Sequence, residues 1–244
     1  MTGPPPLADT IAAFDARSST YDDSRMHHAF AAAAVQAAAP RAGQTLLDVA
    51  GGTGLAARKA LPHLKAAVVL DASAGMLHEA RRQEPRLHLV RADGHHLPLP
   101  EASVDRVTCI TALHLFHDPS RALAEMARTC RPDGRIVFTT WAAQGWRLSR
   151  ALRRAAAAEG VHVPNAYAQT GTADAVRALA AGSGLRTYDV ASVRHEEPLA
   201  DRATAWARVT ARQPVPERVR VRFERELPDV DEHVVLLVTC GPIR

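Results

Sequence analysis

Residues 46–57, LLDVAGGTGLAA, pass from an apolar run into a cluster of glycines, with Asp48 just before them. A short apolar run of this kind is typical of a strand buried on both faces of a parallel sheet. The glycines that follow let the backbone turn sharply and approach a ligand, and a helix that begins there presents unpaired N–H groups. We therefore expect a strand–turn–helix unit that binds a nucleotide-like ligand.

The alternation of strand and helix patterns continues as far as residue 141. Strands are expected at residues 45–50, 66–72, 87–92, 106–113 and 135–141, and helices at 55–61, 74–83 and 120–130. Later expectations are a helix capped by Thr172, helices at 200–211 and 217–226, and strands at 185–193 and 233–240. This order predicts an α/β fold with a doubly wound, seven-stranded, mostly parallel sheet, in which the two late strands form an antiparallel edge.

The composition of the chain argues against several classes of protein. The formal net charge is +4, but the arginines are dispersed and no basic block is interleaved with aromatics, so no nucleic-acid partner is expected. No apolar run approaches the roughly 18–20 residues of a membrane span, and the N-terminus lacks the pattern of an export signal. Three cysteines without ligand spacing indicate a reducing compartment. We expect a cytoplasmic protein, either a monomer or a homodimer.

Acidic residues at the ends of the expected strands indicate which nucleotide-like ligand is bound. Residues 52–57 fit the dinucleotide pattern G-x-G-x-x-G/A, and Asp71 ends the second strand where a ribose-binding acid belongs, so a dinucleotide-binding reductase is one alternative. Asp48 would repel a pyrophosphate but attract an ammonium, and Asp93 could accept from an adenine amino group. No Tyr-x-x-x-Lys motif for hydride-transfer chemistry is present. These features favour S-adenosylmethionine.

The chain resembles class I S-adenosylmethionine-dependent methyltransferases, nearest in pattern to the ubiquinone/menaquinone-biosynthesis type and its small-molecule relatives. The segments that resemble the family's motifs are, in chain order, FDARSSTYDDSR, LLDVAGGTG, VVLDASAGML, RADGHHLPLPEASVD and ALHLFHDPSRALAEMARTCRPDGRIV. The resemblance covers roughly residues 10–141 and implies a Rossmann-like methyltransferase fold. Ala50 departs from it, because many members have glycine there; alanine should be tolerated if the backbone stays extended. Residues 142–215 match no motif.

With 244 residues the chain is expected to form a single methyltransferase domain. Within it we expect a helical lid at residues 10–40, a cofactor-binding core at 41–141, an acceptor-side cap with a helical insertion after the fifth strand at 142–215, and a C-terminal helix and strand at 216–244.

The resemblance implies how the methionine portion of the cofactor is held. Ala50, Gly52 and Gly54 would line it by close approach of the backbone. Asp48 would hold the ammonium, directly or through water, and Thr111 would contact the methionine end by its backbone. Asp48 could instead simply cap the following helix.

The resemblance also implies contacts with the nucleoside portion. Asp71 would bind the ribose hydroxyls, Met76 would pack on the adenine face, and Asp93 and Gly94 would address the adenine edge. Tyr21 would close over the cofactor from the N-terminal helix. Each side chain has a purely structural alternative: a helix cap for Asp71, core packing for Met76, a turn for Asp93 and an exposed aromatic for Tyr21.

The implied reaction is an in-line transfer of a methyl group to an O, N or C atom of a small organic acceptor, such as a secondary metabolite or a quinone-like ring, with S-adenosyl-L-homocysteine as product. His114 and His117 follow the fourth strand and are candidate general bases. Trp141, Trp146 and Tyr167 are candidates for the acceptor pocket, or else core residues. A further alternative is an S-adenosylmethionine-binding protein with a non-methylating reaction or a regulatory role.

The remaining histidines and arginines give weaker signals. Neither the pair His95 and His96 nor the pair His114 and His117 has a cysteine or carboxylate at ligand spacing, so no metal is expected. Four arginines would suit an anionic acceptor if they faced the pocket, but a solvated helix face is the simpler interpretation; they are Arg147, Arg150, Arg153 and Arg154.

Overall fold

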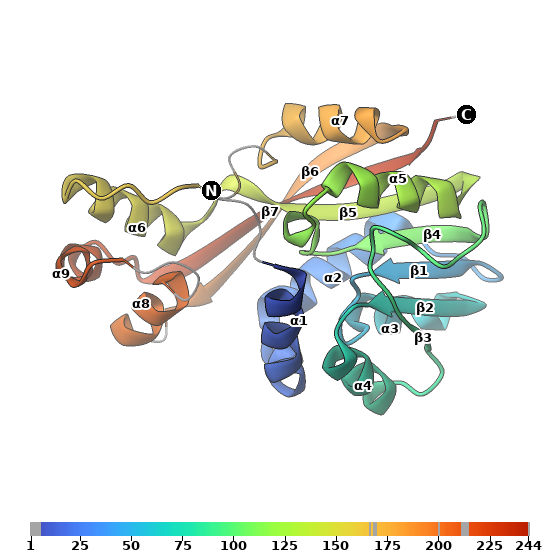
Figure 1. Ribbon diagram of the computed structural model, residues 1–244, viewed down its shortest axis with the longest axis horizontal. Coiled ribbons are helices and arrows are strands. Elements are labelled where there is room, and N and C mark those ends of the chain that lie inside the picture. The colour runs from blue at the N-terminus through green and yellow to red at the C-terminus, as the bar shows by residue number, and fades with distance from the viewer. Residues whose placement is uncertain (1–5, 166, 168–169, 200, 211–214, 244) are drawn as a thin grey trace.

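A computed structural model describes residues 6–165, 167, 170–199, 201–210 and 215–243. Seven strands of these residues form one sheet (Figure 1). In chain order they are β1 (Thr45–Val49), β2 (Ala66–Asp71), β3 (His88–Arg91), β4 (Val104–Cys109), β5 (Cys130–Trp146), β6 (Leu185–Pro198) and β7 (Val230–Pro242). Their order across the sheet is β3-β2-β1-β4-β5-β7-β6. Strands β1 to β5 are parallel, and β7 runs antiparallel to both β5 and β6, so the predicted fold class is confirmed.

Helices separate these strands along the chain, except that a loop joins β3 to β4. The α-helices are α1 (Leu7–Ala16), α2 (Arg25–Ala38), α3 (Leu55–Ala60), α4 (Ala74–Gln83), α5 (Pro119–Thr129), α6 (Arg147–Ala158), α7 (Ala173–Gly182), α8 (Arg202–Thr210) and α9 (Glu217–Arg225). Three short 3-10 helices are η1 (Ser18–Asp23), η2 (Leu61–His63) and η3 (Leu113–Leu115). The side chain of Thr172 accepts the N–H of Ala175 and caps α7, as the sequence predicts. Within the described residues no helix has the length and apolar character needed to cross a bilayer.

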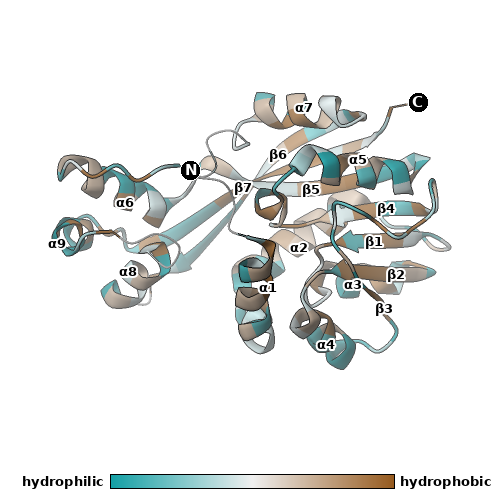
Figure 2. Ribbon diagram, in the orientation of Figure 1, coloured by the Kyte–Doolittle hydropathy of each residue, from teal (hydrophilic) through white to brown (hydrophobic). Residues whose placement is uncertain are grey.

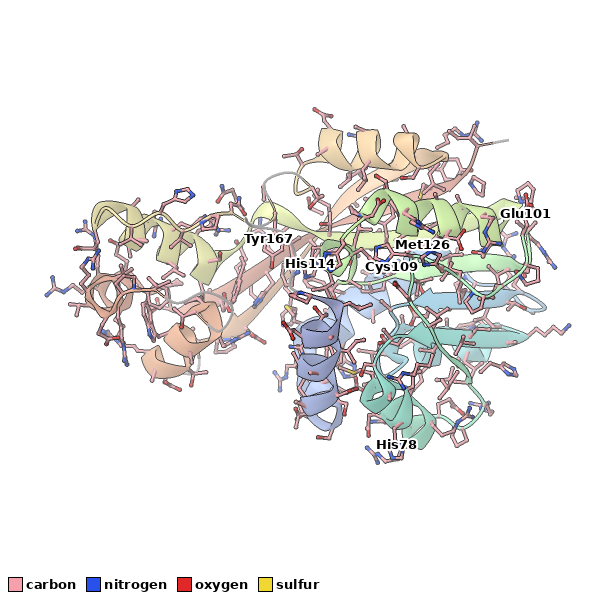
Figure 3. All side chains as sticks on the ribbon, in the orientation of Figure 1. His78, Glu101, Cys109, His114, Met126 and Tyr167 are labelled. Carbon is pink, nitrogen blue, oxygen red and sulfur yellow. The ribbon has the colours of Figure 1, made fainter. Side chains whose placement is uncertain are left out.

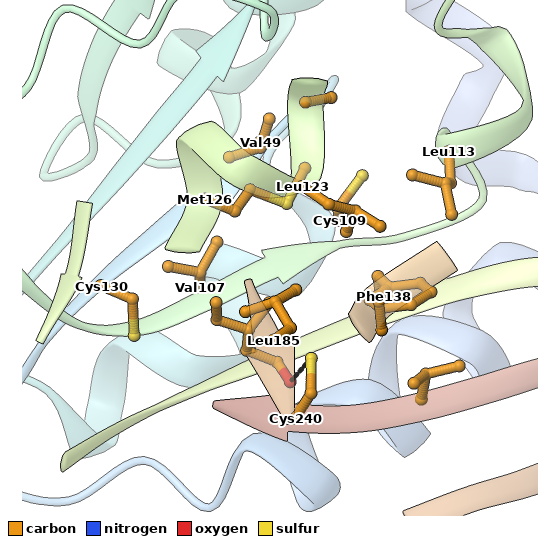
Figure 4. Close-up of a cluster of buried hydrophobic side chains, with 14 of the residues drawn as sticks. Val49, Val107, Cys109, Leu113, Leu123, Met126, Cys130, Phe138, Leu185 and Cys240 are labelled. Carbon is orange, nitrogen blue, oxygen red and sulfur yellow. Dashed lines mark hydrogen bonds between the residues drawn. The ribbon is translucent and has the colours of Figure 1, made fainter. Parts of the chain in front are cut away.

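The central strands are buried on both faces, which explains their continuous apolar runs. Leu46 of β1 packs with α3 and α4 on one face, whereas its neighbour Leu47 packs with α5 and α7 on the other. Figure 4 shows Leu123 and Met126 of α5 within the second of these clusters. The covering helices carry both hydrophilic and hydrophobic colours in Figure 2, because each turns one side to the sheet and the other to water.

A second, smaller core lies beyond one end of the sheet, where β6 and β7 extend past the parallel strands (Figure 1). Helices α6, α8 and α9 pack on one another there, through Leu152, Val209 and Phe223 among others. Helix α7 lies apart from this group and covers the sheet beside α5. We call these three helices the cap; their role on the acceptor side stays a prediction. The division of the chain at residues 141 and 215 stays a prediction.

Two expectations about strand ends are wrong. Ala50 is not extended: its φ of 51° lies in the left-handed region, where the chain leaves β1 and Gly51 donates its N–H to the Leu70 carbonyl. The fourth strand ends at Cys109 rather than at residue 113, because Thr111 also has a φ of 51° and turns the chain out of the sheet. The N–H of Thr111 is bonded by the Thr139 hydroxyl oxygen at 2.7 Å, which fixes that turn.

The turn after β1 should tolerate a side chain poorly at Gly54. Its φ is 72°, and a Cβ there would lie 2.9 Å from Leu87 Cδ1 and 3.2 Å from Val69 Cγ2. Gly43 has a similar φ of 84° but nothing within 4 Å, so it is a matched control for backbone strain alone. We expect Gly43→Ala to lower the free energy of unfolding by about 1–2 kcal/mol. Gly54→Ala should cost about 1–3 kcal/mol more from overpacking.

Urea denaturation of both variants measures the difference. Equal losses would show that Leu87 and Val69 move aside, and that packing behind the turn does not require glycine.

Candidate functional site

The carboxyl ends of β1, β2, β3 and β4 open into one cavity. Nine of the ten residues predicted to bind the cofactor line it, and these are Tyr21, Asp48, Ala50, Gly52, Asp71, Met76, Asp93, Gly94 and Thr111. Gly54 is the exception, because it faces Leu87 and Val69 behind the turn. The geometry therefore brings almost the whole predicted set together around one space.

Asp71 organises the glycine-rich turn. One carboxylate oxygen, Oδ2, accepts the N–H of Gly52 at 2.8 Å, and the other, Oδ1, accepts the N–H of Ser73 at 2.8 Å. Ser73 in turn caps α4 by accepting the N–H of Met76 at 3.1 Å. Burial raises the pKa of Asp71, although these N–H donors oppose that effect. The side chain thus fixes both the turn and the start of α4 while it borders the cavity.

Asp48 is a buried carboxylate at the floor of the cavity. It accepts a hydrogen bond from the Thr108 hydroxyl at 2.7 Å. Burial raises the pKa of Asp48 to about 6, and the bonds from Thr108 and from the Ala57 N–H only partly offset this. A Cβ on Gly51 would lie 2.8 Å from Asp48 Cγ, so the turn passes directly over the carboxylate. A cationic ligand group would stabilise the charged form of this acid.

Asp93 and Gly94 form the wall of the cavity beyond β3. Asp93 Oδ1 accepts the backbone N–H of His95 at 3.0 Å and lies 2.7 Å from the ring Nδ1 of the same residue. A Cβ on Gly94 would lie 2.7 Å from Phe116 Cε1, so this ring packs directly on the glycine. Phe116 also lines the cavity, which sequence reasoning missed.

The N-terminal segment covers the cavity and is fastened to it by two carboxylates. Asp15 of α1 accepts the N–H of Gly75 at 2.8 Å and also the Ser73 hydroxyl. Asp22 of η1 accepts the Thr53 hydroxyl at 2.6 Å and forms an ion pair with Arg58. Sequence reasoning missed both acids, although they lie within the segment FDARSSTYDDSR, whose Tyr21 it did select. We call α1 and η1 together the lid.

Tyr21 lies at the boundary between the cavity at the strand ends and a second cavity. Its ring stacks on His27 with 4.2 Å between the ring centroids, and it comes from η1 rather than from a regular helix. Five residues border both cavities, namely Phe14, Tyr21, His27, Thr111 and Leu115. The second cavity is further lined by Arg17, Met26, His114, Trp141, Trp146, Tyr167, Arg208, Val209 and His233. We call the first the strand-end cavity and the second the aromatic cavity.

The two candidate bases lie in different places. His114 borders the aromatic cavity, with 5.5 Å between its ring centroid and that of Tyr167, and Figure 3 shows these two side chains close together. His117 borders the strand-end cavity instead. The three predicted aromatics, Trp141, Trp146 and Tyr167, all line the aromatic cavity.

The arginines of α6 do not line the aromatic cavity. Arg147 and Arg150 pair with Glu232 at 3.6 and 3.2 Å. Arg154 lies 3.7 Å from Glu226, and Arg153 donates to the oxygens of Gln144 and Ser149. Arg17 and Arg208 border the cavity in their place. No local pattern marks Arg208 as a site residue, because the packing of α8 with α6 and α9 brings it there.

Comparison with known proteins agrees with this geometry. Residues 47–138 match the family described as "Methyltransferase domain". A demethylmenaquinone methyltransferase from Clavibacter sepedonicus is 35% identical over 136 residues, which cover 52% of this chain and 56% of that protein. The chain thus spans little more than half the length of that relative.

Solved structures share the fold at low sequence identity. An N-methyltransferase from Haemonchus contortus, in complex with phosphomonomethylethanolamine and S-adenosylhomocysteine, superposes with a TM-score of 0.54 at 15% identity, covering 88% of this chain and 52% of that one. SpnF, described as a (4+2)-cyclase, superposes with a TM-score of 0.66 at 17% identity over 100% of both chains. Residues 47–138 of this chain therefore match a methyltransferase domain in sequence, as the motifs predict, and the sheet that contains them shares the Rossmann-like methyltransferase fold.

Proposed function

We propose that this protein transfers a methyl group from S-adenosylmethionine to an O, N or C atom of a small organic acceptor and releases S-adenosylhomocysteine. The observation that carries the proposal is the meeting of the two cavities at Tyr21, His27 and Thr111. A donor in the strand-end cavity and an acceptor in the aromatic cavity would face each other across this boundary. Such an arrangement is what an in-line displacement requires.

The strand-end cavity fits this cofactor. The hydrogen-bond partners of Asp48 are a hydroxyl and a backbone N–H, so a ligand ammonium would supply the cation that its buried carboxylate lacks. Asp71 would meet the ribose hydroxyls, Met76 would pack on the adenine, and Asp93 and Gly94 would lie at its edge. The bound cofactor supplies an electrophilic methyl group on its sulfonium.

The work of the chain is then positioning and exclusion of water. The lid closes the strand-end cavity, since Asp15 and Asp22 hold it against α4 and the glycine-rich turn. Trp141, Trp146 and Tyr167 present flat surfaces to the acceptor, which favours a planar ring such as a quinone-like compound. The similarity to a demethylmenaquinone methyltransferase supports that acceptor class.

A second candidate is an S-adenosylmethionine-binding protein that catalyses a reaction other than methylation. The chain shares its fold with the cyclase SpnF over the full length of both chains. We keep this second candidate because a shared fold alone does not determine the chemistry.

The proposed reaction is tested by turnover of the purified chain with S-adenosylmethionine and reduced naphthoquinones, phenols and aromatic amines. We expect S-adenosylhomocysteine to form only when an acceptor is present. Gly52→Val should abolish cofactor binding, because Gly52 has a φ of 57° and borders the cavity, whereas Gly43→Val adds a similar backbone strain at an open position and should bind normally. Cofactor binding without any S-adenosylhomocysteine would favour the second candidate, and no binding would contradict both.

Cofactor affinity should depend on the charge of Asp48. Because the pKa of this acid is raised to about 6, protons compete with the ligand ammonium below that pH. Calorimetry should show the affinity falling by up to about tenfold per pH unit below that point, since one proton is exchanged. Asp48→Asn should bind weakly at neutral pH and lose this dependence. If the cofactor affinity of Asp48→Asn fell with pH as that of the wild type does, with circular dichroism unchanged at each pH, Asp48 would not be part of the site.

The base hypothesis now concerns His114 alone, since His117 borders the other cavity. If His114 takes the proton of a phenol or enol, His114→Ala should lower kcat by about 10²–10⁴-fold with cofactor affinity unchanged. His117→Ala is the matched control and should alter cofactor affinity rather than kcat. Full turnover by His114→Ala on a protic acceptor would show that His114 is not the base.

A further inference from the structure

Four side chains of β6 and β7 gather on one face of these antiparallel strands. Their register sets His195 opposite His233 and Glu197 opposite Asp231. Alternate residues of a strand point to the same face, so all four project together. One ligand-type atom from each of Glu197, Asp231 and His233 lies within 4.8 Å of the other two. We call these four residues the β6–β7 cluster.

The cluster contains buried polar atoms without partners. The side chains of Asp231 and His233 are 0% and 3% exposed. Among the described residues, Asp231 Oδ1, His233 Nδ1 and His195 Nε2 have no hydrogen-bond partner. A buried polar atom left unpaired is unfavourable, so three together indicate a ligand that would satisfy part of the set.

The two carboxylates of the cluster could bind a cation in place of Arg208. Arg208 lies 3.1 Å from Glu197 Oε1 and 3.7 Å from Asp231 Oδ2, so one guanidinium faces two carboxylates. The Arg208 side chain is 39% exposed and stands on α8, from which it can swing into solvent. Trp146 also donates to Asp231 Oδ2, at 3.1 Å, and holds that carboxylate in place.

We propose that the β6–β7 cluster binds a divalent transition-metal ion of the zinc class through Glu197, Asp231 and His233. His195 lies outside the group whose ligand atoms are all within 4.8 Å of one another, but its Nε2 is 3.8 Å from Glu197 Oε2, so a shift of its side chain would make it the fourth ligand. Imidazole nitrogen combined with carboxylate oxygen suits zinc, whereas magnesium prefers oxygen ligands and retained water. The sequence search missed this site, because the patterns His-x-Glu and Asp-x-His lie on strands far apart in the chain.

The site adjoins the aromatic cavity, because His233 and Arg208 are among its lining residues. A bound ion would cross-link β6 and β7 at the wall of that cavity and displace Arg208 from the two carboxylates. The inference does not depend on the proposed methyl transfer.

The test is calorimetric titration of the tag-free, chelator-treated full chain with ZnCl₂ and, separately, MgCl₂. We expect one zinc ion per chain at this site and far weaker binding of magnesium. Glu197→Gln should weaken zinc binding by about tenfold or more, judging from the 10–100-fold cost of disturbing even the outer partners of metal ligands. Glu196→Gln is the matched control, since this neighbour points to the opposite face and its side chain is 49% exposed. At equal concentration, zinc should raise the Tm of Glu197→Gln less than it raises that of the wild type and of Glu196→Gln.

Arg208→Gln separates a metal site from a plain ion-pair network. Removal of a competing cation should tighten zinc binding, whereas a network without a metal would only lose stability. His195→Gln provides a second ligand variant if Glu197→Gln fails to fold, and it too should weaken binding. Equal zinc affinity in the wild type, Glu197→Gln and His195→Gln, or no zinc binding by the folded wild type, would overturn the proposal.

Discussion

The hydrogen bond from the Gly52 N–H to the Asp71 carboxylate, 2.8 Å long, joins the turn after β1 to the end of β2. These two strands are parallel neighbours, so their carboxyl ends lie side by side and a single side chain can bridge them. The bond fixes the turn over Asp48, and the second oxygen of Asp71 directs the chain into α4. The shape of the strand-end cavity therefore depends on one partly buried acid, Asp71, and the glycines that can approach it.

The lid depends on the same region. Its acid Asp15 binds at the start of α4, and its acid Asp22 binds the side chains of Thr53 and Arg58 at the glycine-rich turn. A cofactor that fills the strand-end cavity must enter past these contacts, so lid opening and cofactor exchange are coupled in the proposed function. The lid also carries Tyr21 to the boundary of the two cavities, which links closure to the alignment of donor and acceptor.

Features set by local sequence were predictable, and features set by distant pairing were not. The strand-end acids Asp48 and Asp71 follow from apolar runs that stop at a turn, a pattern visible within ten residues. The left-handed backbone of Ala50 was not predicted, because alanine does not favour that conformation and the turn was expected to lie at the neighbouring glycines. Arg208 and His233 reach the aromatic cavity only through the packing of the cap and the pairing of β7, which no local pattern encodes.

The central claim is that the strand-end cavity presents a methyl donor to the aromatic cavity. The most direct test is a crystal structure of the chain with S-adenosylhomocysteine. We expect the amino group at Asp48, the ribose at Asp71, and the sulfur at the boundary beside Tyr21 and Thr111, facing the aromatic cavity. A sulfur atom directed away from that boundary, or a nucleoside bound without contact to Asp71, would contradict the account.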